Sequence, residues 1–322
     1  MKFRWKTRVK PHVHQPGMWF TTHSARLLQP VCRNFTVSHE SCTRRGGRLP
    51  RPRGRAYSTE VTVVTRSAVV GRVYLVGAGP GSPDLITLRG LHILQSADVI
   101  LPDALVALEL LQEAKPTAKI VPVGKRGYCI GSTHQETIHE AMIRYASLGY
   151  SVCRLKCGDP CIFGRGGEEA EVLTAADVPF EIVPGVTSAM GACADAGIPL
   201  THRDHGQSLT FVTGHHDPDS PDCQLDWDTL AKLPTVVFYM AVRHIEKIAH
   251  RLTLAGMDPS THAAVIESGT LPEQRVIDAR LNTIGVDVQD AGITGPAIFV
   301  VGSVVGIRQK LIESVSRAGV LV

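Results

Sequence analysis

The chain lacks any long apolar run. Nowhere in its 322 residues do about 18 consecutive apolar residues occur, the length that a helix needs to cross a bilayer. The C-x-x-C pairs that mark many zinc and redox motifs are also missing from its eight cysteines. We therefore expect neither a membrane-spanning segment nor a disulfide framework.

A metal centre is not expected either. Cys153, Cys157 and Cys161 recur at every fourth residue, a spacing that on a helix would gather three thiols around a metal ion. The intervening Gly158-Asp159-Pro160 is incompatible with a helix, because proline has no amide hydrogen and clashes with the preceding turn.

Acidic residues are scarce in the first 66 positions, which hold 14 Lys and Arg against only Glu40 and Glu60. The rest of the chain carries 20 basic and 28 acidic residues, so its body is acidic although the net charge is +4. A basic, acid-poor leader with Ser and Thr is typical of an organelle transit peptide. We expect residues 1–68 to be such a leader; a disordered basic tail is the alternative, and no aromatic interleaving favours nucleic acid.

Glycine and charge crowd together between Arg154 and Glu169, directly after a short apolar segment. Four glycines fall within these 16 residues, and each costs about 0.5–1 kcal/mol relative to alanine in a regular element. This density indicates backbone shapes or close approaches that side chains would forbid, so we expect something to dock against this backbone. A second glycine cluster, 77–81, follows an apolar strand pattern at a place where α/β proteins bind nucleotides. Ser82 stands where the dinucleotide fingerprint has its last glycine, which disfavours a nicotinamide site.

Strand and helix patterns alternate from Val69 onward, which is the rhythm of a parallel, doubly wound sheet. A polar segment near 204–207 then precedes a new apolar strand, so we expect an α/β fold with two domains, 69–205 and 206–322. In the first we predict strands at 73–76, 99–101, 119–123, 151–156 and 180–183, and helices at 87–96, 106–113, 135–148, 168–176 and 186–196. In the second we predict strands at 208–213, 235–240, 263–267, 274–279 and 297–301, a helix at 242–255, a short last helix and an irregular loop at 215–226.

Residues 71–308 resemble the uroporphyrinogen-III C-methyltransferases, which are tetrapyrrole methylases that use S-adenosylmethionine. The resemblance rests on eight motifs in order, several of them rich in glycine. They are 76–81, 123–126, 154–169, 183–189, 197–203, 213–215, 238–240 and 267–270.

The resemblance implies two α/β domains with S-adenosylmethionine in the cleft between them, a homodimer, and methylation of uroporphyrinogen III at carbons 2 and 7. The product would be precorrin-2, from which siroheme and corrinoids are made. A bacterial-type body behind a long leader favours a plastid as destination, with a mitochondrion as the alternative. No metal, nucleic acid or membrane is expected as a partner.

Site residues are carried over position by position from the same motifs. Asp103 matches the family's proton acceptor and Lys125 its proton donor, and a helix N-cap is the alternative reading of Asp103. Core packing is the alternative for Met240, and helix capping for Thr187 and Ser188. The implied ligands of the methyl donor are Pro80, Cys157, Gly158, Asp159, Ile162, Thr187, Ser188, Met240 and Gly269.

The eight carboxylates of uroporphyrinogen III demand a basic cleft. Basic residues in or beside the motifs are therefore predicted to bind its acetate and propionate groups, with ordinary surface ion pairs as the alternative. They are Arg89, Lys125, Arg126, Arg165, His202 and Arg203.

The chain departs from the family pattern at Pro102, Cys157 and Cys161, which replace a tyrosine, a glycine and an apolar aromatic. We expect Cys157 to be tolerated. Within the same fold, rival substrates are later corrin precursors, a ribosomal RNA ribose and a modified histidine of a translation factor. From a different class, the rival is a non-catalytic carrier of a tetrapyrrole or nucleotide.

Overall fold

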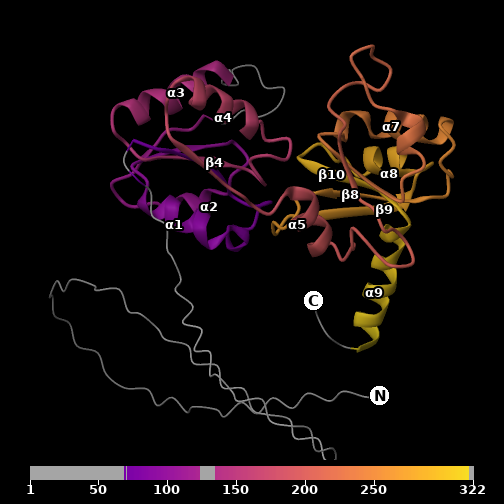
Figure 1. Ribbon diagram of the computed structural model, residues 1–322. Helices are drawn as coiled ribbons and strands as arrows, with labels where there is room; N and C mark the ends of the chain where they lie inside the picture. Colours follow the sequence, from indigo (N-terminus) through magenta and orange to yellow (C-terminus); the bar gives the residue numbers. More distant parts are fainter. Residues whose placement is uncertain (1–68, 70, 124–134, 319–322) are drawn as a thin grey trace, which may run out of the picture. The chain divides into compact units, whose positions relative to one another are not determined.

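The computed structural model describes Val69 and residues 71–123 and 135–318, with side chains through 313 (Figure 1). They belong to one compact unit, Val61–Val322. The predicted leader, Lys125 and Arg126 lie outside the described residues.

The first sheet is entirely parallel, as the alternating pattern predicts. Its strand order is β3-β2-β4-β1-β5. Every residue of β1, β2 and β4 is buried, as expected for strands covered on both faces. The strands are β1 (Val73–Gly77), β2 (Val99–Pro102), β3 (Lys119–Ile120), β4 (Val152–Lys156) and β5 (Phe180–Val183).

Helices cover both faces of this sheet. Figure 1 shows α1 (Leu88–Ser96) and α2 (Leu108–Leu111) on one face and α3 (Gln135–Ser147) and α4 (Gly166–Ala175) on the other. Two apolar clusters fill the space between helices and strands, one containing Ile93 of α1 and the other Met142 of α3. The first sheet thus has the doubly wound form that the sequence predicts.

The second sheet is mixed, in the order β6-β7-β10-β8-β9. Only the β6–β7 pair is parallel among the strand pairs of this sheet; the others run antiparallel. The strands are β6 (Thr210–Thr213), β7 (Thr235–Tyr239), β8 (His262–Glu267), β9 (Arg275–Arg280) and β10 (Ala297–Gly302).

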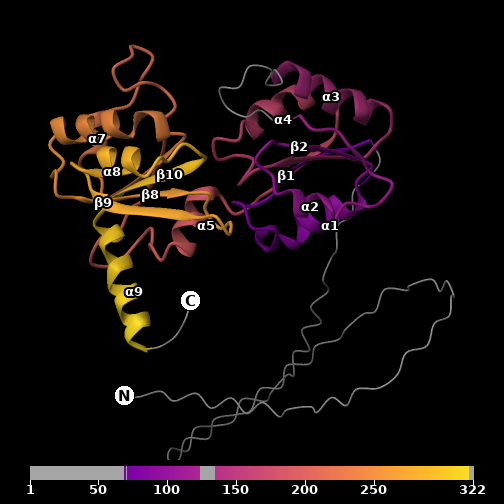
Figure 2. The ribbon, with the colours of Figure 1, turned by 180° about the vertical axis from the view of Figure 1, so that it is seen from behind.

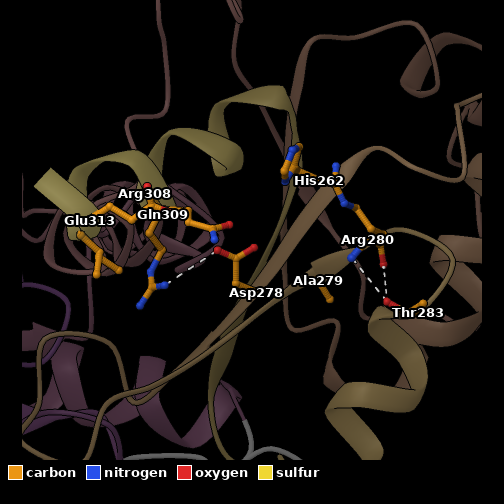
Figure 3. Close-up of a pocket in the computed structure, with 9 residues that line it drawn as sticks. His262, Asp278, Ala279, Arg280, Thr283, Arg308, Gln309 and Glu313 are labelled. Atoms are coloured by element: carbon orange, nitrogen blue, oxygen red, sulfur yellow. Dashed lines mark hydrogen bonds and ion pairs between the residues drawn. The ribbon is translucent and has the colours of Figure 1, made fainter.

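Helices α7 (Ile245–Leu254) and α8 (Ile284–Asp290) cover one face of the second sheet, and α5 (Ser188–Asp195) packs against the other (Figure 2). The packed face of α5 is narrow because it consists of Ala189, Ala192 and Cys193. The small residues that make this helix therefore allow its backbone to approach the sheet. The remaining elements are the four-residue helix α6 (Trp227–Leu230), the longer helix α9 (Gly306–Ala318) and 3-10 turns at Pro83–Leu85, Val242–His244 and Ser303–Val305.

The predicted α/β fold with two sheets is confirmed. The differences between the predicted and the observed helices and strands are local. Strand β3 has two residues where five were predicted, although the amides of Val121 and Val123 beyond it still donate to the carbonyls of Ile100 and Pro102. The predicted helix at 242–255 begins as a 3-10 turn and becomes α-helical at Ile245. Helices α6 and α8 were not predicted. The domain limits at 205 and 206 remain a prediction, although α5 packs with the second sheet.

No helix in the described ranges is long and apolar enough to cross a membrane. The five cysteines with described positions are free. Those same ranges contain no group of three or more His, Cys, Asp or Glu side chains placed to hold a metal ion. Cys153 is fully buried in an apolar cluster whereas Cys161 is exposed, so the four-residue spacing does not bring them together.

Candidate active site

Glycine turns bring the ends of β1 and β4 into direct backbone contact. The amide of Gly158 donates to the carbonyl of Gly79 at 2.7 Å, and the reverse bond measures 3.3 Å. Both residues have left-handed backbones, with φ of 69° and 88°, which glycine adopts without steric cost. At Gly77 a Cβ atom would lie 2.6 Å from the carbonyl oxygen of Gly158. The close approach predicted from the glycine density is therefore present, and it is between two loops of the chain itself.

A cavity of 210 Å³ opens beside these turns, with walls that are mostly apolar. Five of the nine predicted ligands of the methyl donor line it: Pro80, Cys157, Ser188, Met240 and Gly269. Residues carried by loops after strands of both sheets thus meet at one cavity. The other lining residues are Leu105, Ala192, Tyr239, Ile266, Ser268, Leu271, Pro296, Ala297 and Ile298.

The other four predicted ligands lie near this cavity in sequence but not in its wall. The Asp159 carboxylate accepts hydrogen bonds from the amides of Cys161 at 2.8 Å and Gly185 at 3.0 Å. Thr187 shares a 2.7 Å hydrogen bond with the Tyr239 hydroxyl. Ile162 is 37% exposed. For Gly158 and these three residues, contact with the donor stays a prediction.

Three residues around the cavity have left-handed backbones although they are not glycine. They are Met240, Ser268 and Thr270, with φ of 57°, 52° and 68°. Each such residue costs of order 1–3 kcal/mol, and such residues concentrate at ligand sites where the surrounding structure holds them. Met240 follows β7, and Ser268 and Thr270 follow β8. The strained residues therefore all lie in the part of the site that the second sheet supplies.

A larger cavity of 1010 Å³ adjoins the first. The two share Leu105, Met240, Ser268, Leu271, Pro296 and Ala297 as wall residues. The segment 104–109 after β2 forms another part of the larger cavity, whose charged wall residues are Arg243, Glu109 and Glu273. The wall of this cavity is therefore not the basic surface that was predicted for the carboxylates of the substrate. The shared wall places a ligand of one cavity next to a ligand of the other.

Asp103 stands at the end of β2, where its carboxylate forms an ion pair with Arg154 of β4. Arg154 is 2% exposed, and its Nε also donates to Glu169 at 3.0 Å. Burial alone lowers the pKa of this guanidinium, but the charges of Asp103 and Glu169 raise it above its ordinary value. Arg154 is therefore a fixed cation beneath the predicted catalytic carboxylate.

Lys156 completes this charged group. Its Nζ lies 2.9 Å from both carboxylate oxygens of Glu169. Burial, followed by the charge of Arg154, lowers the pKa of the lysine. The N-cap alternative for Asp103 is not observed, because α2 begins at Leu108 with Ala107 as its N-cap.

The predicted substrate-binding side chains lie elsewhere. Arg89 pairs with Glu181 at 3.2 Å, and Arg165 pairs with Glu168 on the adjoining helix. The His202 ring lies 5.0 Å from that of His205, and Arg203 is exposed. None of these four lines either cavity, so their contact with substrate stays a prediction.

Cys157 occupies its position without backbone strain. The left-handed residue of this turn is Gly158, and Cys157 itself does not have a positive φ. Burial, and then the charge of Asp103, raise the pKa of the thiol to about 11. The raised pKa favours the neutral thiol at this place in the cavity wall. Pro102 ends β2, and its carbonyl accepts a 3.2 Å hydrogen bond from Val123.

Sequence reasoning missed two groups of site residues. The glycine-rich run 154–169 contains Arg154, Lys156 and Glu169, for which no role was predicted. For Arg154 and Lys156, the available signal was charge inside an otherwise apolar strand pattern. Tyr239 stands in a quoted motif and also went unassigned. Its hydroxyl accepts from the Ala189 amide at 3.1 Å and joins Thr187.

Loops that follow strands of both sheets meet at an apolar cavity that shares a wall with a larger one, an arrangement suited to an enzyme that brings two bound molecules together. The family model for tetrapyrrole (corrin/porphyrin) methylases matches residues 72–285. The chain belongs to this family.

Named relatives agree with this membership. The chain is 45% identical over 243 residues to the uroporphyrinogen-III C-methyltransferase of Bacillus subtilis, covering 75% of this chain and 94% of that one. It is 38% identical over 314 residues to the siroheme synthase of Acinetobacter baylyi; this covers 96% of the chain but only 64% of that longer protein. A solved structure of the Thermus thermophilus uroporphyrin-III C-methyltransferase, complexed with S-adenyl homocysteine, superposes with a TM-score of 0.62 at 38% identity, over 74% of this chain and all of that one.

Proposed function

We propose that this protein transfers methyl groups from S-adenosylmethionine to uroporphyrinogen III, at carbons 2 and 7, to give precorrin-2 for siroheme synthesis. The observation that carries this proposal is the pair of adjoining cavities with a common wall. One cavity contains five residues expected to contact the donor, and the other has the size for a far larger molecule.

The residues present fit a sulfonium donor. The small cavity combines an apolar wall with a methionine, a serine hydroxyl and glycine backbone, which suits a compact zwitterion whose reactive methyl must be shielded from water. Gly269 in particular leaves no room for a side chain, because a Cβ there would lie 3.0 Å from Cα of Ala192. Pro80, Cys157, Ser188, Met240 and Gly269 would hold the donor.

The chemistry requires little from side chains. A pyrrole carbon that carries an acetate group and no hydrogen forms a bond to the methyl group, and the bond from that methyl to sulfur breaks with its electron pair going to sulfur. The resulting tetrapyrrole cation then gives up a proton, from a pyrrole nitrogen or a meso carbon, to a base. Holding the two reactants in line removes roughly 7–11 kcal/mol of the barrier. Asp103 lies at the edge where such a base is needed, one residue before the segment 104–109 that lines the larger cavity.

The test is anaerobic incubation of the full chain with S-adenosylmethionine and uroporphyrinogen III, followed by mass analysis of the tetrapyrrole. We expect two added methyl groups, and S-adenosylhomocysteine in equal amount. Titration of S-adenosylhomocysteine into the same preparation is the control for donor binding. Binding without a methylated tetrapyrrole would overturn the substrate assignment and favour a later corrin precursor or an RNA, or a non-catalytic carrier.

The oligomeric state and the location of the protein are part of the same proposal. We propose a homodimer, on the resemblance to the family, which size-exclusion chromatography with light scattering tests directly. We propose import into a plastid, supported by the excess of 14 basic over two acidic residues in positions 1–66. Fusing residues 1–68 to a fluorescent protein tests import; a fusion that stays outside plastids and mitochondria would contradict it.

A further inference from the structure

Four charged side chains form one connected cluster beneath the strand ends of the first sheet. Each of the three guanidinium nitrogens of Arg154 has a partner: Nη2 pairs with Asp103, Nε donates to Glu169 at 3.0 Å, and Nη1 donates to the carbonyl of Leu101 at 3.0 Å. The guanidinium therefore bridges two carboxylates and is also anchored to β2.

Glu169 is the centre of the cluster and is completely buried. Its carboxylate contacts Arg154, Lys156 and the amide of Gln135, the last at 3.3 Å. The two cations and two carboxylates balance, which is the condition for burying charge at all. A buried ion pair, however, gains little or no stability over apolar side chains of the same shape. Stability alone thus gives no reason for this arrangement.

One member of the cluster is partly exposed, next to the segment that lines the larger cavity. The Asp103 side chain is 27% exposed, against 2% for Arg154, 2% for Lys156 and 0% for Glu169. The next residues along the chain line the larger cavity, and the charge of Asp103 acts on the Cys157 thiol in the wall of the smaller one. The other three are inside the protein, so any effect they have on a ligand passes through Asp103.

We propose that Glu169 is a positioning residue for Asp103: it locks the guanidinium of Arg154 between two carboxylates and balances the charge of Lys156, so that the Asp103 carboxylate is held in one place beside the segment that lines the larger cavity. This inference rests on the proposed function, which supplies the proton that Asp103 would accept. The glycine-rich run thus has two roles, because Arg154 and Glu169 at its two ends hold Asp103 and Cys157 between them lines the smaller cavity.

The direction in which each substitution should shift the pH dependence of the methylation rate follows from the charges that face Asp103. Glu169→Gln leaves two cations against one carboxylate, so the acid limb of the methylation-rate profile should move to lower pH. Arg154→Met removes a cation, so the same limb should move to higher pH. Opposite shifts from two neighbouring buried positions are not expected from general loosening of the fold. The groups that face Asp103 come from three elements. Strand β4 and its end supply Arg154, Lys156 and Cys157, and α4 supplies Glu169. Behind Glu169, α3 supplies Gln135 and His139, whose Nε2 atoms lie 3.2 Å apart.

The experiment compares Glu169→Gln with Glu171→Gln, an exposed glutamate on the same helix. Three quantities are measured on the full-length protein: the single-turnover methylation rate from pH 5 to 9, the Kd of S-adenosylhomocysteine, and thermal stability. Because small misplacements of a reacting group cost up to about 100-fold, we expect Glu169→Gln to slow methylation roughly 10- to 100-fold. Its Kd should match that of Glu171→Gln, and the acid limb of its rate profile should move to lower pH.

Arg154 supplies a second arm in case Glu169→Gln does not fold. Arg154→Lys keeps the charge but cannot bridge two carboxylates, so it should slow methylation with donor binding intact, and Arg154→Met should move the acid limb to higher pH. Rates within twofold of the Glu171→Gln control, or acid limbs that do not move, would overturn the positioning role. Loss of donor binding in parallel with rate would do the same. If the wild-type protein and the control do not methylate the tetrapyrrole, the proposed function itself has failed.

Discussion

The hydroxyl of Tyr239 on β7 shares a 2.7 Å hydrogen bond with Thr187, the residue before α5. It also accepts a hydrogen bond from the Ala189 amide at 3.1 Å. One phenol oxygen therefore ties the first turn of α5 to the second sheet. Since Ser188 and Met240 are the neighbours of these two residues in sequence and both line the smaller cavity, this bond sets how far apart two walls of the cavity stand.

Removing that oxygen should weaken both the fold and the cavity. Tyr239→Phe leaves the buried Thr187 hydroxyl and the Ala189 amide without their partner, which costs about 1–3 kcal/mol of unfolding free energy. Denaturant titration measures this loss, and the affinity for S-adenosylhomocysteine should fall with it. Tyr150→Phe, at a tyrosine that is 45% exposed, is the control. Equal stability of the two variants would show that the bond does not hold α5.

A methyl group at Gly269 should be rejected by the fold. A Cβ atom would overlap the Ala192 side chain and lie 3.0 Å from its Cα, and overpacking of this kind costs about 1–3 kcal/mol. Gly269→Ala is therefore expected to lower the unfolding free energy and the donor affinity together. At Gly167 a Cβ would meet nothing within 4 Å, so Gly167→Ala should be neutral or stabilising. The prediction fails if both alanines are equally tolerated.

Replacing Cys157 by glycine should leave donor binding unchanged. The Cys157 backbone has no positive φ, so glycine relieves no strain, and only a neutral thiol is lost from the wall. Calorimetric titration of S-adenosylhomocysteine into Cys157→Gly and into the wild-type protein checks this. Much tighter binding by the variant would mean that the thiol crowds the donor.

Asp98 should make stability depend on pH. Hydrogen bonds from Lys115, and then from Ser151, lower the pKa of Asp98 to about 2. Its stabilising effect is complete above the unfolded-state pKa of about 4 and disappears as the pH falls toward 2. With its side chain 30% exposed, we expect Asp98→Asn to cost on the order of 1–2 kcal/mol at pH 7.

Denaturant titrations at pH 7, 5 and 3 test this dependence. The gap in unfolding free energy between the wild-type protein and Asp98→Asn should be similar at pH 7 and 5 and smaller at pH 3. Asp290→Asn, on the exposed end of α8, should show no such gap. A gap of constant size at all three values would assign the effect of Asp98 to packing rather than charge.

The fold could be predicted where apolar runs are bounded by glycine or proline, as at Phe180–Val183, which matches the observed β5. Helix α8 was missed because Gly285, Val286 and Val288 make Ile284–Asp290 a poor helix by composition; it forms because Ile284 and Val288 are buried in the core of the second sheet. Its stability is tertiary in origin.

The site, like the fold, has parts that could be predicted from the sequence and parts that could not. Motif positions brought together at cavity walls, such as Pro80, Ser188 and Met240, follow from family resemblance. The pairing of Asp103 with Arg154 does not, because it depends on the register that sets Leu101 opposite Arg154 across two strands distant in sequence. Long side chains can reach several partners, and spacing along a sequence does not choose among them.

The left-handed backbones of Met240, Ser268 and Thr270 have a consequence for protein engineering. Glycine at any of the three would release stored conformational energy, so these positions are natural targets in a screen for heat resistance. The same substitutions would remove the side chains or the rigidity that shape the cavity walls, because Met240 and Ser268 line both cavities and Thr270 lines the larger one. Selection for thermal stability alone is therefore expected to favour substitutions at these three residues that lower the turnover rate. This is the usual trade-off between stability and activity.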